Sequence, residues 1–232
     1  STKTTNYQSV SEVKQLFEEP DDGQLVKINL SNSNEELNFD RDKTFERPKF
    51  LQETTKATAA EIGQATHLIL QKLDLTLEVS RKNIEKAMKN LVSEGVLNQK
   101  ITERIEVNKI IDYFKSDFGQ KIRKNGDKVK KEVLFSLLIE AGEVFEEMEG
   151  LKDSILIHGM IDGYFELKEG LVLFDYKTDR LSHLTGNTEE ILTNRYNSQL
   201  RLYKKALEEI TNKEVVEMAI IALDTGETIY LE

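Results

Sequence analysis

Residues 154 to 177 read SILIHGMIDGYFELKEGLVLFDYK, two apolar and β-branched segments on either side of Lys168-Glu169-Gly170. Segments of this length and composition, separated by a turn signal, predict β-strands over residues 154–167 and 171–177. A tight connection would make the two strands antiparallel neighbours. The remaining elements can be placed around this pair.

Three charged residues interrupt these strands: Asp162 in the first, and Asp175 and Lys177 at the end of the second. Burying an unpaired carboxylate or ammonium is strongly unfavourable, so such groups pair with each other, bind a metal or shift their pKa. Side chains alternate across a strand, which puts Asp175 and Lys177 on one face, roughly 6 to 7 Å apart, and the Tyr176 side chain on the other. Asp175 and Lys177 are therefore expected to contribute to one site.

The length of the connecting loop decides whether Asp162 joins that site. A two-residue loop at Lys168-Glu169 or at Glu169-Gly170 places Asp162 opposite Asp175 or Lys177, and on their face. A three-residue loop turns Asp162 to the other face unless a bulge intervenes.

Two carboxylates directed at one point form a hard, oxygen-rich site that suits Mg²⁺. Such an ion polarises a phosphodiester and helps to generate hydroxide from water, while Lys177 orients that water or neutralises the charge that builds on the phosphate. The alternative is a buried Asp–Lys ion pair that only closes the hairpin. The spacing by itself favours neither interpretation.

The N-terminal half is predicted to be largely helical after a polar arm. A capping-box spacing precedes a short helix at residues 10–18, and both prolines lie in the polar stretch at residues 19–55. Thr58 and Glu61 repeat the capping-box spacing. Apolar residues at helical spacing then predict helices at residues 59–73, 80–94 and 101–116.

The period of the apolar residues changes after a basic stretch at residues 121–131. The pattern predicts a helix at residues 190–211 and further strands at residues 132–139, 215–223 and 228–231, the last two joined by a turn. We therefore expect an α/β domain at residues 57–232, with a central mixed sheet flanked by helices. An arm and linker at residues 1–56 precedes it.

Composition limits what this domain can be. The chain has 232 residues, no cysteine and no apolar run near the roughly 20 residues of a membrane span, which predicts a soluble cytoplasmic protein without disulfides. Its 42 acidic and 32 basic residues give a net charge of −10. Nucleic-acid-binding domains usually carry a basic excess, so this balance weighs against DNA binding unless a local basic track or another part of a larger protein supplies the contacts.

Four motifs resemble, in the same order, those of RecB-family nucleases in the PD-(D/E)xK superfamily. Gly63 to His67 resembles the G-x-x-x-H helix of that family, and Gly159 to Tyr164 resembles its G-x-x-D segment. Asp175 to Thr178 matches D-Y-K-[ST], and Gln199 to Tyr203 matches Q-x-x-x-Y. The resemblance implies a restriction-endonuclease-like fold and hydrolysis of DNA.

The same resemblance implies roles for single residues. His67, Asp162 and Asp175 would bind Mg²⁺ or Mn²⁺ together with the Tyr176 carbonyl, and Lys177 would be the catalytic lysine. The alternative for His67 is an ordinary helix histidine.

Gln199 and Tyr203 lie at i and i+4 on one face of the predicted helix. By the resemblance they would belong to the catalytic site and contact the active centre or the DNA. The alternative is a tertiary hydrogen bond from the glutamine and a tyrosine that belongs to the core.

Nearly the whole chain resembles the C-terminal domain of the AddA (RexA) family of bacterial helicase-nuclease subunits, including Ser9 to Lys14 and Arg47 to Phe50. The absence of cysteine separates it from the AddB family, whose members hold an iron-sulfur cluster. The resemblance implies a Mg²⁺-dependent exonuclease in double-strand break repair and recombination. Its partners would be a DNA single strand, helicase domains of the same polypeptide and an AddB- or RexB-type subunit, with no membrane.

Two further interpretations remain open. The fold could serve as a non-catalytic docking module within a DNA-repair complex, which predicts a broken active centre, whereas the four residues of the expected centre are all present. The basic clusters at residues 121–124 and 128–131, with Arg180 and Arg201, form either a track that guides a DNA strand or an ordinary solvated face.

Overall fold

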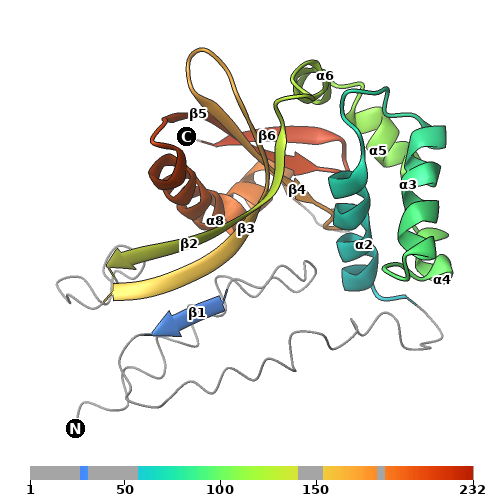
Figure 1. Cartoon of the computed structure of the whole chain (residues 1–232), viewed down its shortest axis with the longest axis horizontal. Helices are drawn as coiled ribbons and strands as arrows, with labels where there is room; N and C mark the ends of the chain where they lie inside the picture. The colour runs from blue at the N-terminus through green and yellow to red at the C-terminus, as the bar shows by residue number, and fades with distance from the viewer. Residues whose placement is uncertain (1–26, 31–56, 141–153, 182–185, 232) are drawn as a thin grey trace, which may run out of the picture.

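The computed structural model describes residues 27–30, 57–140, 154–181 and 186–231. These residues form a mixed sheet with helices on both faces (Figure 1), which confirms the predicted fold class. The strands are β1 (Lys27–Leu30), β2 (Lys130–Glu140), β3 (Ser154–Glu166), β4 (Leu171–Lys177), β5 (Val215–Ala222) and β6 (Glu227–Leu231). Their order is β1-β3-β4-β5-β6, with β2 paired to β3; β4 and β5 are parallel and the other pairs are antiparallel.

β3 is the strand around which the sheet divides. One edge pairs with β2 from Ser154 to Tyr164. The other edge pairs with β1 at residues 155–158 and with β4 at residues 163–166. Among the described strands, residues 159–162 therefore have no ladder partner on that second edge, and Asp162 lies where β3 and β4 separate.

Helices cover both faces of the sheet (Figure 1). They are α2 (Ala59–Lys72), α3 (Arg81–Ser93), α4 (Gln99–Thr102), α5 (Val107–Tyr113), α6 (Asp117–Lys124) and α8 (Thr188–Thr211). One core lies between α2–α6 and the sheet, and the other lies between α8 and the opposite face. Alternate residues of β4 supply the two cores, Phe174 the first and Leu173 the second. Because both faces are covered, β4 is buried along its whole length, as expected for a strand with a parallel neighbour.

The predicted helices at residues 59–73 and 80–94 are confirmed, and α2 begins with the predicted capping box of Thr58 and Glu61. The single helix predicted at residues 101–116 is wrong. The helices α4 and α5 replace it, because the chain leaves the helical conformation between them, where the Glu106 backbone has ψ 70°. The described residues 57–124 contain the helices α2 to α6, joined by short loops.

The predicted strands are confirmed, and β5 and β6 form the expected hairpin. Within the predicted arm, Lys27–Leu30 forms β1, a strand that the polar composition of residues 19–55 did not predict. The helix predicted at residues 10–18 lies outside the described residues. No helix in the described ranges has the length and apolar character of a membrane span.

Candidate active site

The loop between β3 and β4 has the shorter of the two predicted lengths. The Leu167 amide donates to the Gly170 carbonyl at 2.8 Å, which closes a two-residue loop at Lys168-Glu169. Pairing then runs from Glu166↔Leu171 to Gly163↔Phe174. The pairing ends at Gly163↔Phe174, so the two strands separate before Asp162 and Asp175 could form a ladder pair.

Asp162 of β3 contacts residues of both β4 and α2. Its Oδ2 accepts a hydrogen bond from the Tyr176 amide at 2.8 Å, where a backbone carbonyl of β3 would accept if the ladder continued. His67 Nδ1, from α2, is 3.3 Å from the same oxygen. Asp162 is 6% exposed and His67 is 9% exposed. The carboxylate therefore links β3, β4 and α2 at the point where the sheet opens.

Asp175 and Lys177 project from β4 toward α8. Lys177 Nζ is 3.1 Å from Asp175 Oδ2 and donates to Gln199 Oε1 at 3.0 Å. The Gln199 amide in turn donates to the Tyr203 hydroxyl at 2.7 Å. All four residues are buried, and Asp175 and Lys177 are only 1% and 2% exposed. The structure thus brings Gln199 and Tyr203 to the lysine as a hydrogen-bonded chain.

Tyr196, a residue that the sequence analysis did not single out, also contacts the lysine. Lys177 Nζ lies 4.0 Å from the centre of the Tyr196 ring, a cation–π contact. The Tyr196 hydroxyl donates to Asp179 Oδ2 at 2.7 Å, and Arg195 donates to the other oxygen of Asp179. Tyr196 precedes Gln199 by three residues and so lies on the same helix face, a spacing that could have identified it.

Glu132 is a third acid beside Asp162. The register of β2 and β3 runs from Lys131↔Gly163 to Val133↔Ile161, so Glu132 stands across from Asp162. Burial raises the pKa of Glu132, and the nearby Asp162 carboxylate raises it further. Its backbone has φ 49°, a left-handed conformation that is unfavourable for a residue with a Cβ and is often found at functional sites. No local pattern of residues indicates this conformation, so Glu132 was missed.

Both Asp162 and Asp175 affect the pKa of Tyr203, the tyrosine at the end of the hydrogen-bonded chain. Burial raises the pKa of Tyr203 well above its usual value, and Asp175 and Asp162 add to that effect while Lys177 opposes it. Tyr203 therefore keeps its proton at neutral pH.

The donor atoms suit a hard divalent ion, although they are not gathered as one cluster. In the described part of the chain, no group of three or more His, Cys, Asp or Glu side chains is arranged to hold a metal ion. The contacts form two sets instead, His67 with Asp162 and Asp175 with Lys177. Carboxylates from adjacent strands, an imidazole and the carbonyl of Tyr176 are nonetheless ligands that Mg²⁺ or Mn²⁺ accepts.

Two lysines of the basic clusters serve the fold. Lys131 donates to the carbonyls of Leu70, Gln71 and Leu73 at the end of α2, the Gln71 bond being 2.7 Å. Lys121 forms an ion pair with Glu217 of β5 at 2.5 Å. Lys121 and Lys131 are therefore excluded from the hypothetical DNA track.

Comparison with known proteins agrees with this architecture. A model of the PD-(D/E)XK nuclease superfamily matches residues 41–230. Proteins named as the A subunit of an ATP-dependent helicase/nuclease are similar over nearly the whole chain. The one from Pediococcus pentosaceus is 39% identical over 240 residues, which is 100% of this chain and 19% of the relative. Those from Lactiplantibacillus plantarum and Enterococcus faecalis are 40% and 36% identical over 231 and 233 residues, 96% and 97% of this chain. Each of these two alignments covers 18% of the relative, so the chain spans less than a fifth of the length of its relatives.

Proposed function

The chain belongs to the PD-(D/E)XK nuclease superfamily, and from that premise we propose that it hydrolyses DNA phosphodiester bonds with an active centre formed by Asp162, Asp175 and Lys177. The observation that carries the proposal is the placement of Lys177. Its ammonium is buried beside Asp175. The amide of Tyr176, which lies between these two residues on β4, donates to Asp162. A buried ammonium is costly without a partner of opposite charge, which Asp175 supplies here, and in the proposal this pair faces the phosphate and its metal ion.

Hydrolysis needs a water molecule to attack phosphorus and the bond to the leaving oxygen to break. Negative charge builds on the phosphate during this step, and the Lys177 ammonium is the buried cation available to stabilise it. A divalent ion held by His67, Asp162, Asp175 and the Tyr176 carbonyl would supply Lewis-acid activation of the phosphate and of the water. We propose Mg²⁺ as that ion, with Mn²⁺ as an alternative.

Gln199 and Tyr203 fix the position of the lysine in this proposal. The Gln199 carbonyl oxygen accepts from Lys177, and its amide group is held by Tyr203, so the glutamine cannot turn away. Tyr196 closes the other side of the ammonium. A lysine that is fixed before the substrate arrives loses no further freedom in the reaction.

The names of the relatives extend the proposal to the longer protein. They are called helicase/nuclease subunits, so we infer that an attached helicase delivers a single strand to this domain and that the domain acts as an exonuclease in double-strand break repair. An AddB-type subunit is the expected partner. Delivery by a motor would also account for a nuclease domain with a net charge of −10, because the motor would supply much of the grip on DNA.

The proposal is tested by degradation of end-labelled linear single-stranded DNA with and without Mg²⁺. The 232-residue chain is compared with Lys177→Ala, and circular dichroism verifies that both are folded. We expect cleavage that needs the metal and that the substitution abolishes. Metal-dependent cleavage that survives Lys177→Ala would remove the lysine from the proposed centre.

Absence of cleavage by both proteins would require a second measurement, because a domain that needs its motor and a docking module behave alike in that assay. Mn²⁺ titration of the chain and of Asp162→Ala by calorimetry separates them. Binding that depends on Asp162 supports the nuclease. No binding by either protein supports the non-catalytic docking module.

A further inference from the structure

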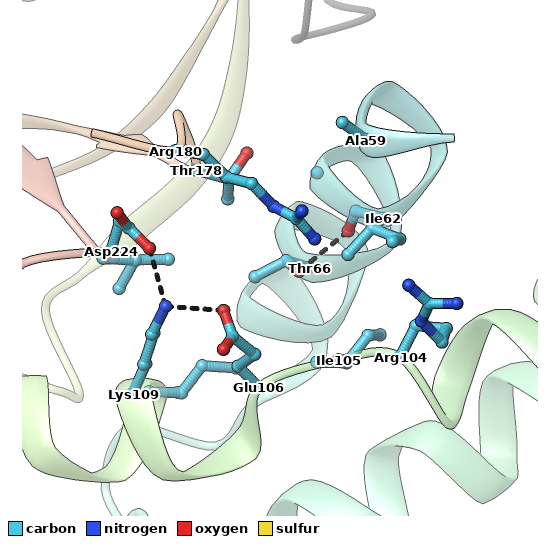
Figure 2. Close-up of a pocket in the computed structure, with 13 residues that line it drawn as sticks. Ala59, Ile62, Thr66, Arg104, Ile105, Glu106, Lys109, Thr178, Arg180 and Asp224 are labelled. Atoms are coloured by element: carbon cyan, nitrogen blue, oxygen red, sulfur yellow. Dashed lines mark hydrogen bonds and ion pairs between the residues drawn. The ribbon is translucent and has the colours of Figure 1, made fainter. Parts of the chain in front are cut away.

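A pocket of about 60 Å³ lies beside the proposed active centre, between α2 and the segment that joins α4 to α5 (Figure 2). Its lining includes Gly63 and Thr66, which precede His67 by four residues and one residue, and Thr178, which follows Lys177. The lining does not include Asp162, Asp175 or Lys177 themselves. The pocket is therefore a neighbour of the centre and not the centre itself.

Two arginines give the pocket an excess of positive charge. Arg104 lies in the segment between α4 and α5, and Arg180 lies three residues after Lys177; both are exposed lining residues. Figure 2 shows the Arg180 side chain reaching toward Thr66 of α2. Neither guanidinium makes a hydrogen bond or ion pair with another residue in the described ranges.

The carboxylates that line the pocket are already engaged. Lys109 Nζ binds Glu106 and Asp224 at 2.6 Å each, and Asp224 also accepts from the Leu181 amide at 2.9 Å. The pocket thus has three cationic and two anionic lining residues, a positive excess in a chain whose net charge is −10. That excess comes from Arg104 and Arg180.

We propose that Arg104 and Arg180 form a subsite for a backbone phosphate of the DNA strand, next to the phosphate that is cleaved. This inference rests on the proposed nuclease function. Guanidinium groups bind phosphate oxygens through paired N–H donors, and a strand lying across the end of β4 meets Arg180 directly after the catalytic lysine. The subsite would hold the strand in register, while the buried centre performs the chemistry.

Binding of an oligothymidylate is measured in the presence of a chelator, so that no cleavage occurs, at several salt concentrations. The variants are Arg104→Ala, Arg180→Ala and the double variant. Lys86→Ala/Lys89→Ala on the exposed face of α3 is the control, because it removes the same charge away from the pocket. We expect the double arginine variant to bind about tenfold more weakly, and its salt slope to fall by about 0.7 for each phosphate that the arginines no longer bind. The control should keep the affinity and slope of the unmodified chain.

A second arm identifies the phosphate. Single methylphosphonates, which are neutral, replace one phosphate at a time along the oligonucleotide, and a parallel series lacks the terminal phosphates. One internal substitution should weaken binding by the unmodified chain but not by the double arginine variant. Dependence on a terminal phosphate alone, or equal losses in the arginine and lysine variants, would overturn the subsite. Lys177-dependent cleavage tests the nuclease separately, so failure of the subsite can be told from failure of the proposed function.

Discussion

At the scale of single residues, the ion pair of Asp175 and Lys177 is the feature with the largest expected effect on stability. Their side chains are 1% and 3% exposed. Lys177→Met removes the ammonium that lies 3.1 Å from the Asp175 carboxylate. We expect a loss of about 3 to 5 kcal/mol in the free energy of unfolding, because a buried carboxylate without its counter-charge is strongly unfavourable. Urea denaturation measures the loss.

The matched control is Asp175→Asn/Lys177→Met, which removes both charges. Replacing a whole buried ion pair by neutral groups is often close to neutral in stability, so this variant should regain most of what Lys177→Met loses. If the double variant lost as much unfolding free energy as Asp175→Asn and Lys177→Met lose together, the two groups would not be coupled.

At the scale of elements, Lys131 joins β2 to the end of α2. Lys131→Met removes the donor to the carbonyls of Leu70, Gln71 and Leu73, which should cost about 1 to 3 kcal/mol. Thermal or urea unfolding measures the cost, with Lys128→Met as the control on the same segment. An unchanged free energy of unfolding would show that water replaces the ammonium at these carbonyls.

The same lysine predicts a dependence on pH. Burial lowers the pKa of Lys131 below its usual value of 10.5, so the folded state disfavours the charged form. Between the lowered pKa and 10.5, the unfolded chain holds more protons than the folded one, and stability from this group rises with pH. The unfolding free energy of the unmodified chain, relative to Lys131→Met, should therefore increase as the pH rises toward 10.5. A constant difference would contradict the lowered pKa.

Gly163 sets the packing at the last ladder pair before β3 and β4 separate. A Cβ at this position would lie 2.2 and 2.5 Å from ring carbons of Phe174, closer than van der Waals contact. Gly163→Ala should destabilise the domain by about 1 to 3 kcal/mol through overpacking. The added substitution Phe174→Leu should make the alanine less costly, as a double-mutant cycle by urea denaturation would show. If Gly163→Ala lowered the unfolding free energy equally in the unmodified chain and in Phe174→Leu, the Phe174 ring would not be the source of the strain.

The sequence predicted the elements whose patterns are local. The apolar segments at residues 154–167 and 171–177 were enough for the central hairpin, and the Thr58 capping box was enough for the start of α2. Local pattern failed at residues 101–116, where the chain breaks between α4 and α5 and no side-chain cap at Glu106 marks the start of the second helix. It also failed for Glu132, because a positive φ and a position across from Asp162 depend on pairing between distant strands.

At the scale of the whole molecule, the net charge argues against DNA binding, whereas the candidate site favours a DNA nuclease. A net charge of −10 argues against strong independent DNA binding, and only part of the basic sequence is available for it, since Lys121 and Lys131 are used by the fold. The predicted site residues come from α2, β3, β4 and α8 and form two contact sets, His67 with Asp162 and Asp175 with Lys177, Gln199 and Tyr203. Spacing could pair Asp175 with Lys177, but the contact of Gln199 with Lys177 needed the fold.

Lys128 and Lys130 remain among the basic residues of the hypothetical DNA track, and both line an open hollow together with Lys168. Lys128→Ala/Lys130→Ala should reduce the salt slope of single-strand binding by about 0.7 for each lysine that contacts a phosphate, without loss of stability. Binding of an oligonucleotide at several salt concentrations measures the slope. Identical salt slopes in the variant and the unmodified chain would remove these two lysines from the track.

The most direct test of the central claim is the initial rate of Mg²⁺-dependent cleavage of linear single-stranded DNA by the chain and by Asp175→Asn/Lys177→Met. This variant keeps the buried site neutral and should remain folded, so a change in rate reports on chemistry and not on stability. We predict a fall of about 100-fold or more, because the variant loses a metal-binding carboxylate and the cation beside the phosphate. Metal-dependent cleavage at an unchanged rate would contradict the assignment of the active centre to these residues.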